Sequence, residues 1–270
     1  MYYFTNDYSE GAHPLIMQKL LETNMEQTDV YGSDQYCANA KALIKTACGR
    51  EDADVHLFIG GTQTNFTIIS AALRPFQGVY SSFLGHINTH EAGAIEHTGH
   101  KVLELPTADG KLTAQQVEEN YLIYLNDPKR EHWVQPKMVY ISHPSEVGTL
   151  YTKNELEELS ATCKKYGLYL FLDGARLGYG LMSPGTDLTL KDIARLCDVF
   201  YIGGTKCGAL FGEAAVILNP DLKPDFHTIM KQSGAVLAKG RLLGLQFQTL
   251  FTDNLYEKIC QHGINMAMLL

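Results

Sequence analysis

Two short segments carry residue types whose order suits the chemistry of an amine bound to a carbonyl. Residues 173–176 read Asp-Gly-Ala-Arg and residues 203–206 read Gly-Gly-Thr-Lys, and each segment follows a short, apolar, strand-like run. A carboxylate at one strand end can hold a pyridine ring nitrogen protonated, and a lysine at the next can hold an aldehyde as a Schiff base. The pair Asp173 and Lys206 therefore predicts a pyridoxal phosphate site.

The neighbours of these two residues favour the same interpretation. Gly203 and Gly204 let the backbone approach a cofactor closely, and Thr205 offers a hydroxyl to a phosphate. The planar guanidinium of Arg176 suits the 3-oxygen of the cofactor or a substrate carboxylate. A surface ion pair is the alternative for Arg176.

A second glycine turn, residues 60–65 (Gly-Gly-Thr-Gln-Thr-Asn), follows a predicted strand and opens a predicted helix. Backbone N–H groups at a helix N-terminus favour an anion. We expect Gly61 and Thr62 to bind the cofactor phosphate. The alternative is an ordinary glycine turn in which Thr62 caps the helix.

Two groups of polar residues are candidates for proton transfer. His86 and His90 stand four apart and can share one face of a helix, but the HExxH frame of a metal site is absent, so we expect no metal. A more favourable role for one histidine of this region is that of a flat ring stacked on the cofactor, or of a base beside it. His143 and Glu146 follow a predicted strand where substrate should lie, and a proline-containing turn is the alternative for this segment.

The pattern of apolar runs predicts an α/β fold. Predicted strands cover residues 55–59, 79–81, 102–105, 138–142, 169–172, 199–202 and 214–218, and predicted helices include residues 14–22, 36–47, 62–73 and 153–165. This alternation predicts a mostly parallel sheet between two layers of helices. Ligands of such sheets bind at the carboxyl ends of the strands, where the candidate residues fall.

The C-terminal part of the chain differs in pattern. Residues 241–261 predict one long amphipathic helix, and residues 266–270 are apolar. We expect residues 1–240 to form a cofactor-binding large domain with an N-terminal arm. We expect residues 241–270 to be a connecting helix and the start of a truncated small C-terminal domain.

Composition excludes several other classes of protein. The net charge of −8 over 270 residues, with no block of Lys and Arg, argues against a nucleic-acid partner. No apolar run approaches the roughly 18 residues of a membrane span, and the first residues do not resemble a signal peptide. The six scattered cysteines are typical of reduced thiols, which predicts a cytoplasmic protein.

Taken together, five segments resemble the threonine aldolase family, the low-specificity L-threonine aldolases within the β-eliminating lyase group of fold-type I pyridoxal phosphate enzymes. They are residues 29–32 (Asp-Val-Tyr-Gly), 61–63 (Gly-Thr-Gln), His86 with residues 91–93 (Glu-Ala-Gly), 173–176 and 205–206. The resemblance implies retro-aldol cleavage of L-threonine or L-allo-threonine to glycine and acetaldehyde, through an external aldimine and a quinonoid. It also implies a homodimer or homotetramer with shared active sites.

The resemblance assigns roles to single residues. It implies that Lys206 is the Schiff-base lysine, that Asp173 is the partner of the ring nitrogen, and that His86 is the ring-stacking histidine and the third catalytic residue. The expected cofactor contacts are Gly61, Thr62, His86, Asp173, Arg176, Thr205 and Lys206, and the expected substrate contacts are Asn6, Tyr31, Arg176, His143 and Glu146.

The chain departs from the family pattern in two places. Many members have a histidine near the position of Ser145 and Glu146, and members continue into a small domain that supplies an arginine for the substrate carboxylate. Other functions therefore stay open at this point. They are another pyridoxal phosphate lyase that eliminates at Cβ, an amino-acid racemase, and a catalytically silent cofactor-binding protein.

Overall fold

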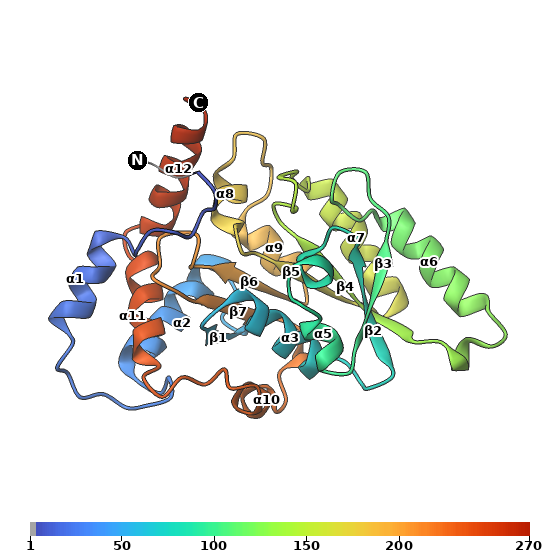
Figure 1. The fold of residues 1–270 in the computed structure, drawn as a ribbon, viewed down its shortest axis with the longest axis horizontal. Coiled ribbons are helices and arrows are strands. Elements are labelled where there is room, and N and C mark those ends of the chain that lie inside the picture. Colours follow the sequence, from blue (N-terminus) through green and yellow to red (C-terminus); the bar gives the residue numbers. More distant parts are fainter. Residues whose placement is uncertain (1–3) are drawn as a thin grey trace.

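The computed structural model describes residues 4–270, which fold around one seven-stranded sheet in the order β1-β7-β6-β5-β4-β2-β3 (Figure 1). The strands are β1 (Asp54–Phe58), β2 (Gln77–Ser82), β3 (Lys101–Leu105), β4 (Gln135–Ser142), β5 (Tyr169–Asp173), β6 (Val199–Gly203) and β7 (Glu213–Ile217). All strands run parallel except β7, which pairs antiparallel with β1 and β6. The predicted α/β fold with a mostly parallel sheet is confirmed.

Helices cover both faces of this sheet. They are α1 (Pro14–Glu22), α2 (Gln35–Cys48), α3 (Gly61–Ala72), α4 (His86–Thr89), α5 (Ala94–His97), α6 (Ala114–Asn126), α7 (Lys153–Tyr166), α8 (Leu177–Met182), α9 (Leu190–Leu196), α10 (Phe226–Gln232), α11 (Arg241–Leu250) and α12 (Leu255–Ala267). Two single 3-10 turns, η1 (Arg130–His132) and η2 (Pro220–Leu222), complete the set. None of the helices within residues 4–270 has the length and apolar character needed to cross a bilayer.

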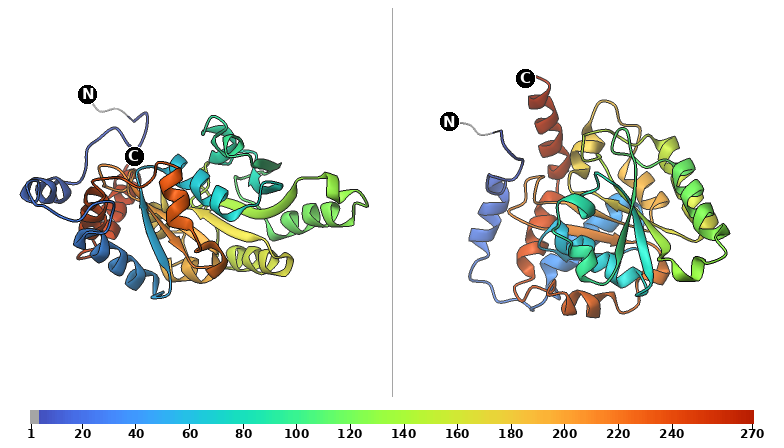
Figure 2. Two further views of the ribbon diagram at one scale, coloured as in Figure 1. Left: turned by 90° about the horizontal axis from the view of Figure 1, so that it is seen from below. Right: turned by 45° about the vertical axis from the view of Figure 1, so that its right-hand side comes forward.

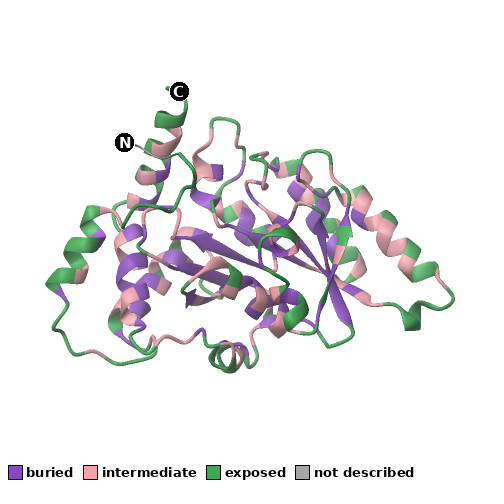
Figure 3. Cartoon of the chain, in the orientation of Figure 1, coloured by how far each residue is buried: buried purple, intermediate pink, exposed green. Residues whose placement is uncertain are grey.

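Alternation along the strands divides the interior into two cores. In β5, Leu170 and Leu172 pack with α2, α7, α9 and α11, whereas Phe171 packs on the other face with α3, α5 and α10. Successive side chains of a strand point to opposite faces, so Asp173 shares the face of Phe171 and lies on the α3 side. Strands β2, β6 and β7 are buried along their whole length between these layers, whereas the edge strand β3 has exposed residues (Figure 3).

The C-terminal segment corrects the prediction of one long helix over residues 241–261. The chain forms two helices, α11 and α12, because Asp253 and Asn254 adopt positive φ angles of 53° and 57°. That left-handed conformation cannot continue a right-handed helix, and Asp and Asn tolerate it better than most residues.

The two helices then take different partners. In α11, Gly244 approaches α2 so closely that an added Cβ would lie 2.4 Å from the backbone nitrogen of Cys37. This helix lies beside α1 and α2 at one end of the sheet (Figure 2). In contrast, α12 packs on α8 and projects away from the sheet, so only its first half is buried.

Candidate active site

A cavity of about 370 Å³ opens at the carboxyl ends of the parallel strands. It brings together eight of the residues expected from the sequence: Gly61, Thr62, His86, Glu146, Asp173, Arg176, Thr205 and Lys206. These residues come from the ends of β4, β5 and β6, the start of α3 and the start of α4. The prediction that they lie at one edge of the sheet agrees with the structure.

Asp173 lies at the floor of this cavity with its carboxylate held by four donors. Tyr140 Oη donates to Oδ2 at 2.5 Å, and Tyr201 Oη donates to Oδ1 at 2.5 Å. Asn65 Nδ2 (3.1 Å) and the backbone N–H of Ala175 (3.0 Å) complete the set. Complete burial raises the pKa of both tyrosines well above the usual value, so they stay O–H donors.

Sequence reasoning missed these donors, although strand alternation accounts for them. Tyr140 in β4 and Tyr201 in β6 belong to the α3-side core, the face that Asp173 also occupies. Asn65 lies one turn after the glycine that opens α3. An added Cβ on Gly61 would meet Tyr201 Oη at 3.1 Å, so glycine at this position lets the N-terminus of α3 approach the carboxylate group.

Lys206 follows β6 in a turn packed tightly against its neighbours. An added Cβ on Gly203 would lie 2.2 Å from the carbonyl oxygen of Ala175, and one on Gly204 would lie 2.7 Å from the carbonyl oxygen of Gly212. Within the chain, these two glycines therefore allow close approach to backbone atoms of neighbouring segments. The carbonyl of Lys206 accepts a hydrogen bond from Tyr179 Oη at 2.8 Å, which fixes the backbone of the turn.

His86 faces the cavity and is oriented by a buried acid. Its Nδ1 lies 2.7 Å from Glu91 Oε1, which also accepts from Asn65 Nδ2 at 2.7 Å. The bond to Glu91 raises the pKa of His86. The ring of His90 stacks on that of His86 at 5.5 Å, but residues 4–270 hold no cluster of His, Cys, Asp and Glu able to bind a metal ion.

Glu146 reaches the cavity, whereas His143 does not. Glu146 Oε1 accepts from the backbone N–H of His86 at 2.8 Å and from Ser142 Oγ at 2.6 Å, and burial raises the pKa of this carboxyl. His143 is one residue beyond Ser142, so its ring turns to the opposite face and packs beside Tyr151. Burial there lowers the pKa of His143 to about 4, so the ring is neutral at pH 7.

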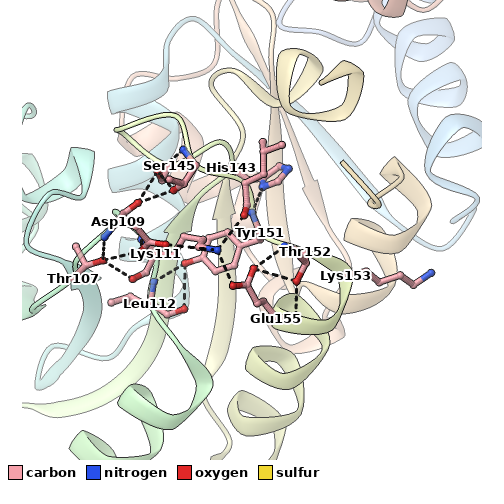
Figure 4. A network of polar contacts seen from close by, with 12 residues as sticks. Thr107, Asp109, Lys111, Leu112, His143, Ser145, Tyr151, Thr152, Lys153 and Glu155 are labelled. Carbon is pink, nitrogen blue, oxygen red and sulfur yellow. Dashed lines mark hydrogen bonds and ion pairs between the residues drawn. The ribbon is translucent and has the colours of Figure 1, made fainter. Parts of the chain in front are cut away.

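The loop that carries Glu146 is held by a polar network (Figure 4). Thr149 Oγ1 lies 2.6 Å from the carbonyl oxygen of Asp109 and 2.6 Å from Ser145 Oγ, which also accepts from the backbone N–H of Thr149 at 3.2 Å. Lys111 Nζ donates to the carbonyl of Leu150 at 3.2 Å and pairs with Glu155 at 2.7 Å. The network fixes both ends of the loop, and with them the position of the Glu146 carboxylate.

The N-terminal segment forms the rim of the site. Asp7 pairs with Arg176 through two hydrogen bonds of 2.5 and 3.0 Å, so the guanidinium group of Arg176 is already engaged in an ion pair. The ring of Tyr8 lies 5.6 Å from Lys206 Nζ. Asn6 lines a neighbouring cavity that shares Tyr8 and Lys206 with the first.

Tyr31 lies apart from these residues. It lines a separate cavity near α10, where Lys231 Nζ lies 4.4 Å from its ring centroid. Asp34, three residues later, caps α2 by accepting from the backbone N–H of Cys37 at 2.9 Å. The single chain therefore does not bring Tyr31 to the cavity that holds Asp173 and Lys206.

Comparison with known proteins assigns the fold and then the family. An aspartate aminotransferase from Thermus thermophilus is 15% identical and superposes with a TM-score of 0.71, covering 96% of this chain and 66% of its own. This likeness identifies the fold as that of the fold-type I enzymes. The family model described as "Beta-eliminating lyase" matches residues 7–267. The chain belongs to the beta-eliminating lyase family and is a lyase.

Two relatives are similar over nearly the whole chain. A low specificity L-threonine aldolase from Pseudomonas aeruginosa is 32% identical over 271 residues, which cover 99% of this chain and 76% of that protein. A solved threonine aldolase structure from Leishmania major is 54% identical, with a TM-score of 0.96, covering 99% of this chain and 77% of its own.

Proposed function

We propose that this protein is a pyridoxal phosphate enzyme that cleaves L-threonine or L-allo-threonine to glycine and acetaldehyde. The observation that carries the proposal is the meeting of Asp173 and Lys206 in one cavity beside the N-terminus of α3. The names of the Pseudomonas and Leishmania relatives supply the substrate class.

The residues of the cavity fit this cofactor. A volume of about 370 Å³ lies in the range of small-ligand sites. Buried polar atoms without a partner, Asn65 Oδ1 and Glu91 Oε2, lie behind the cavity wall next to Asp173 and His86. When bound, pyridoxal phosphate supplies an electrophilic carbon for the substrate amine and a sink for the electrons of the broken bond.

Each residue of the chain then has one task. Lys206 holds the cofactor through its amine, and Asp173 keeps the pyridine nitrogen protonated. Gly61 and Thr62, with Thr205, bind the phosphate at the start of α3. The ring of His86, held by Glu91, stacks on the cofactor.

The remaining tasks concern the substrate. We assign the β-hydroxyl proton to Glu146, because it lines the cavity and burial raises the pKa of its carboxyl toward the range suited to a base. Arg176 binds the substrate carboxylate or the cofactor 3-oxygen, which requires Asp7 to share or release the guanidinium. Asn6 stays a proposed substrate contact. Tyr31 lines a different cavity of the same chain, so its proposed contact with substrate requires the shared active site of the proposed assembly. His143 is turned away from the cavity and is not proposed as a contact.

We further propose that the protein is cytoplasmic and self-associates as a homodimer or homotetramer. Six cysteines without a disulfide support a reducing compartment. Exposed apolar residues on and after α1, such as Leu21 and Met25, support association. The proposed division is a large domain of residues 1–240 and a connecting unit of residues 241–270. Sedimentation of the purified protein measures the assembly.

The direct test is a product assay combined with chemical labelling. Purified protein should form glycine and acetaldehyde from threonine, and borohydride treatment should attach the cofactor to the peptide that contains Lys206. Lys206→Ala should abolish both results, whereas Lys239→Ala, a lysine outside the cavity, should change neither. Label on another lysine, or an absence of glycine from wild-type protein, would overturn the proposal.

A further inference from the structure

Glu213 reaches the site from a strand that runs the opposite way to the others. The parallel strands bring their last residues to the cavity, whereas β7 is antiparallel and brings its first residue. In the sheet, Glu213 pairs with Phe58 of β1 and Gly203 of β6. It therefore lines the cavity between the start of α3 and the turn of Lys206, with only 4% of its surface exposed.

The carboxylate of Glu213 controls the hydroxyl of Thr205. Glu213 Oε1 accepts from Thr205 Oγ1 at 2.8 Å, and Oε2 accepts from the backbone N–H of Gly204 at 3.1 Å. Thr205 Oγ1 in turn accepts from the backbone N–H of Gly212 at 3.0 Å. A hydroxyl has one hydrogen. With that hydrogen given to Glu213, Thr205 has none to donate to an anion in the cavity.

The charged groups around Glu213 disfavour binding of an anion in the cavity while Glu213 is itself ionised. Asp173 faces it from β5 and Tyr201 from β6, and Lys206 in the turn is the nearby cation. Phe58 on β1 is apolar, and the first turn of α3 has no titratable side chain. Within residues 4–270 no ion pair includes Glu213. Burial is the main cause that raises the pKa of Glu213 to about 8.

We propose that Glu213 is a proton-linked positioning residue of the anion-binding part of this cavity. At pH values where the free carboxylate is ionised, binding of a phosphate-like dianion at the N-terminus of α3 is accompanied by transfer of one proton from the buffer to Glu213, which donates it as a hydrogen bond to Thr205 Oγ1. The two lone pairs of Thr205 then accept from Glu213 and Gly212, and its own hydrogen turns to the anion. The proposal rests on the proposed function, because that function places a phosphate there.

Competition between sulfate and pyridoxal phosphate tests this proposal in the full chain. Sulfate is a dianion that does not titrate over the pH range used, and displacement of pyridoxal phosphate, followed by absorbance, reports binding at this cavity. In wild-type protein the affinity for sulfate should fall about tenfold for each pH unit above the pKa of Glu213. Calorimetry in buffers of different ionisation enthalpy should show uptake of about one proton per site near pH 9.

Two variants separate Glu213 from the other groups. Glu213→Gln keeps the hydrogen bonds to Thr205 and Gly204, with the amide N–H as the donor to Thr205. This variant should therefore take up no proton on binding, and its affinity for sulfate should not fall with rising pH as the wild-type affinity does. Thr205→Val should weaken sulfate binding most at about pH 7 and progressively less above the pKa of Glu213, where wild-type binding also requires Glu213 to gain a proton. Thr205→Ser should restore the wild-type profile. Glu104→Gln, on an exposed position of β3, is the matched control.

The outcomes distinguish this proposal from the proposed function. Equal proton uptake and equal pH dependence in wild-type protein and Glu213→Gln overturn the role of Glu213, whatever the enzymatic activity. If Glu213→Gln does not fold, the pH profile of Thr205→Val decides. A sulfate affinity that changes little between about pH 7 and about pH 9 in Thr205→Val supports the proposal, and the same fall in sulfate affinity as in wild-type protein overturns it. A wild-type chain that binds neither pyridoxal phosphate nor sulfate overturns both proposals.

Discussion

The floor and the rim of the cavity each hold a carboxylate beside its donors, but in opposite surroundings. On the floor, Asp173 is buried and accepts four hydrogen bonds from three different elements and its own loop. On the rim, Asp7 pairs with Arg176 where both side chains are partly exposed, at 35% and 45%. Burial makes the first arrangement rigid, whereas water can replace the second at little cost.

The largest effect should come from the floor. Asp173→Asn should lower kcat about a hundredfold or more while cofactor content stays near normal, because an amide cannot hold the pyridine nitrogen protonated and the contacts at Gly61 and Thr62 remain. Absorbance measures cofactor content and glycine formation measures kcat. Near-normal turnover in this variant would remove Asp173 from its assigned role.

The donors on the floor should show a smaller effect. Tyr201→Phe removes one hydrogen bond to a charged group, so the free energy of unfolding should fall by about 1–3 kcal/mol and kcat should fall about tenfold. Chemical denaturation and the glycine assay measure the two changes. Tyr80→Phe, a buried strand tyrosine in the opposite core, is the control and should leave kcat unchanged. Equal effects in the two variants would contradict a specific role for the Tyr201 hydroxyl.

His86 stands between floor and rim. His86→Phe should retain more activity than His86→Ala, because a flat aromatic ring preserves stacking on the cofactor. The comparison needs kcat for both variants at saturating cofactor. Severe and equal loss in both variants would favour proton transfer by His86, which would weaken the assignment of the base to Glu146.

The smallest effect should come from the rim. Partial burial raises the pKa of Asp7, but the bonds from Arg176 outweigh this and hold that pKa below its usual value, so the pair is fully ionised at pH 7. Asp7→Asn should change KM for threonine by no more than about threefold and leave kcat unchanged. Asp52→Asn removes a similar exposed pair with Arg50 far from the cavity and is the control. A loss in kcat as large as that of Asp173→Asn would abolish the distinction between floor and rim.

The sequence was enough to predict the strands and the cofactor residues, because both depend on local pattern. Runs of apolar residues separated by helices placed all seven strands, and residues at strand ends placed Asp173 and Lys206 at one edge. The break at Asp253 and Asn254 escaped prediction, because the apolar stripe continues across it and only the backbone angles reveal the turn.

Residues that depend on strand face or on distant contacts could not be found in the same way. Tyr140 and Tyr201 become donors to Asp173 only through strand register. Ser142 and His143 look equivalent as polar residues at a strand end, yet they point to opposite faces. The pair of Asp7 with Arg176 joins parts of the chain 169 residues apart, and no local pattern indicates it.

The two cores on opposite faces of the sheet limit where residues can be inserted into this chain or deleted from it. Deleting one residue within β5 would turn Asp173 from the α3 face to the face of Leu170 and Leu172, away from all of its side-chain donors. The same deletion in an exposed loop, such as the one between α6 and β4, would leave every strand in register. Insertions and deletions that relatives of this chain have accepted should therefore lie outside the strands. A shift of register within β4, β5 or β6 should mark a protein that has lost the proposed cofactor chemistry.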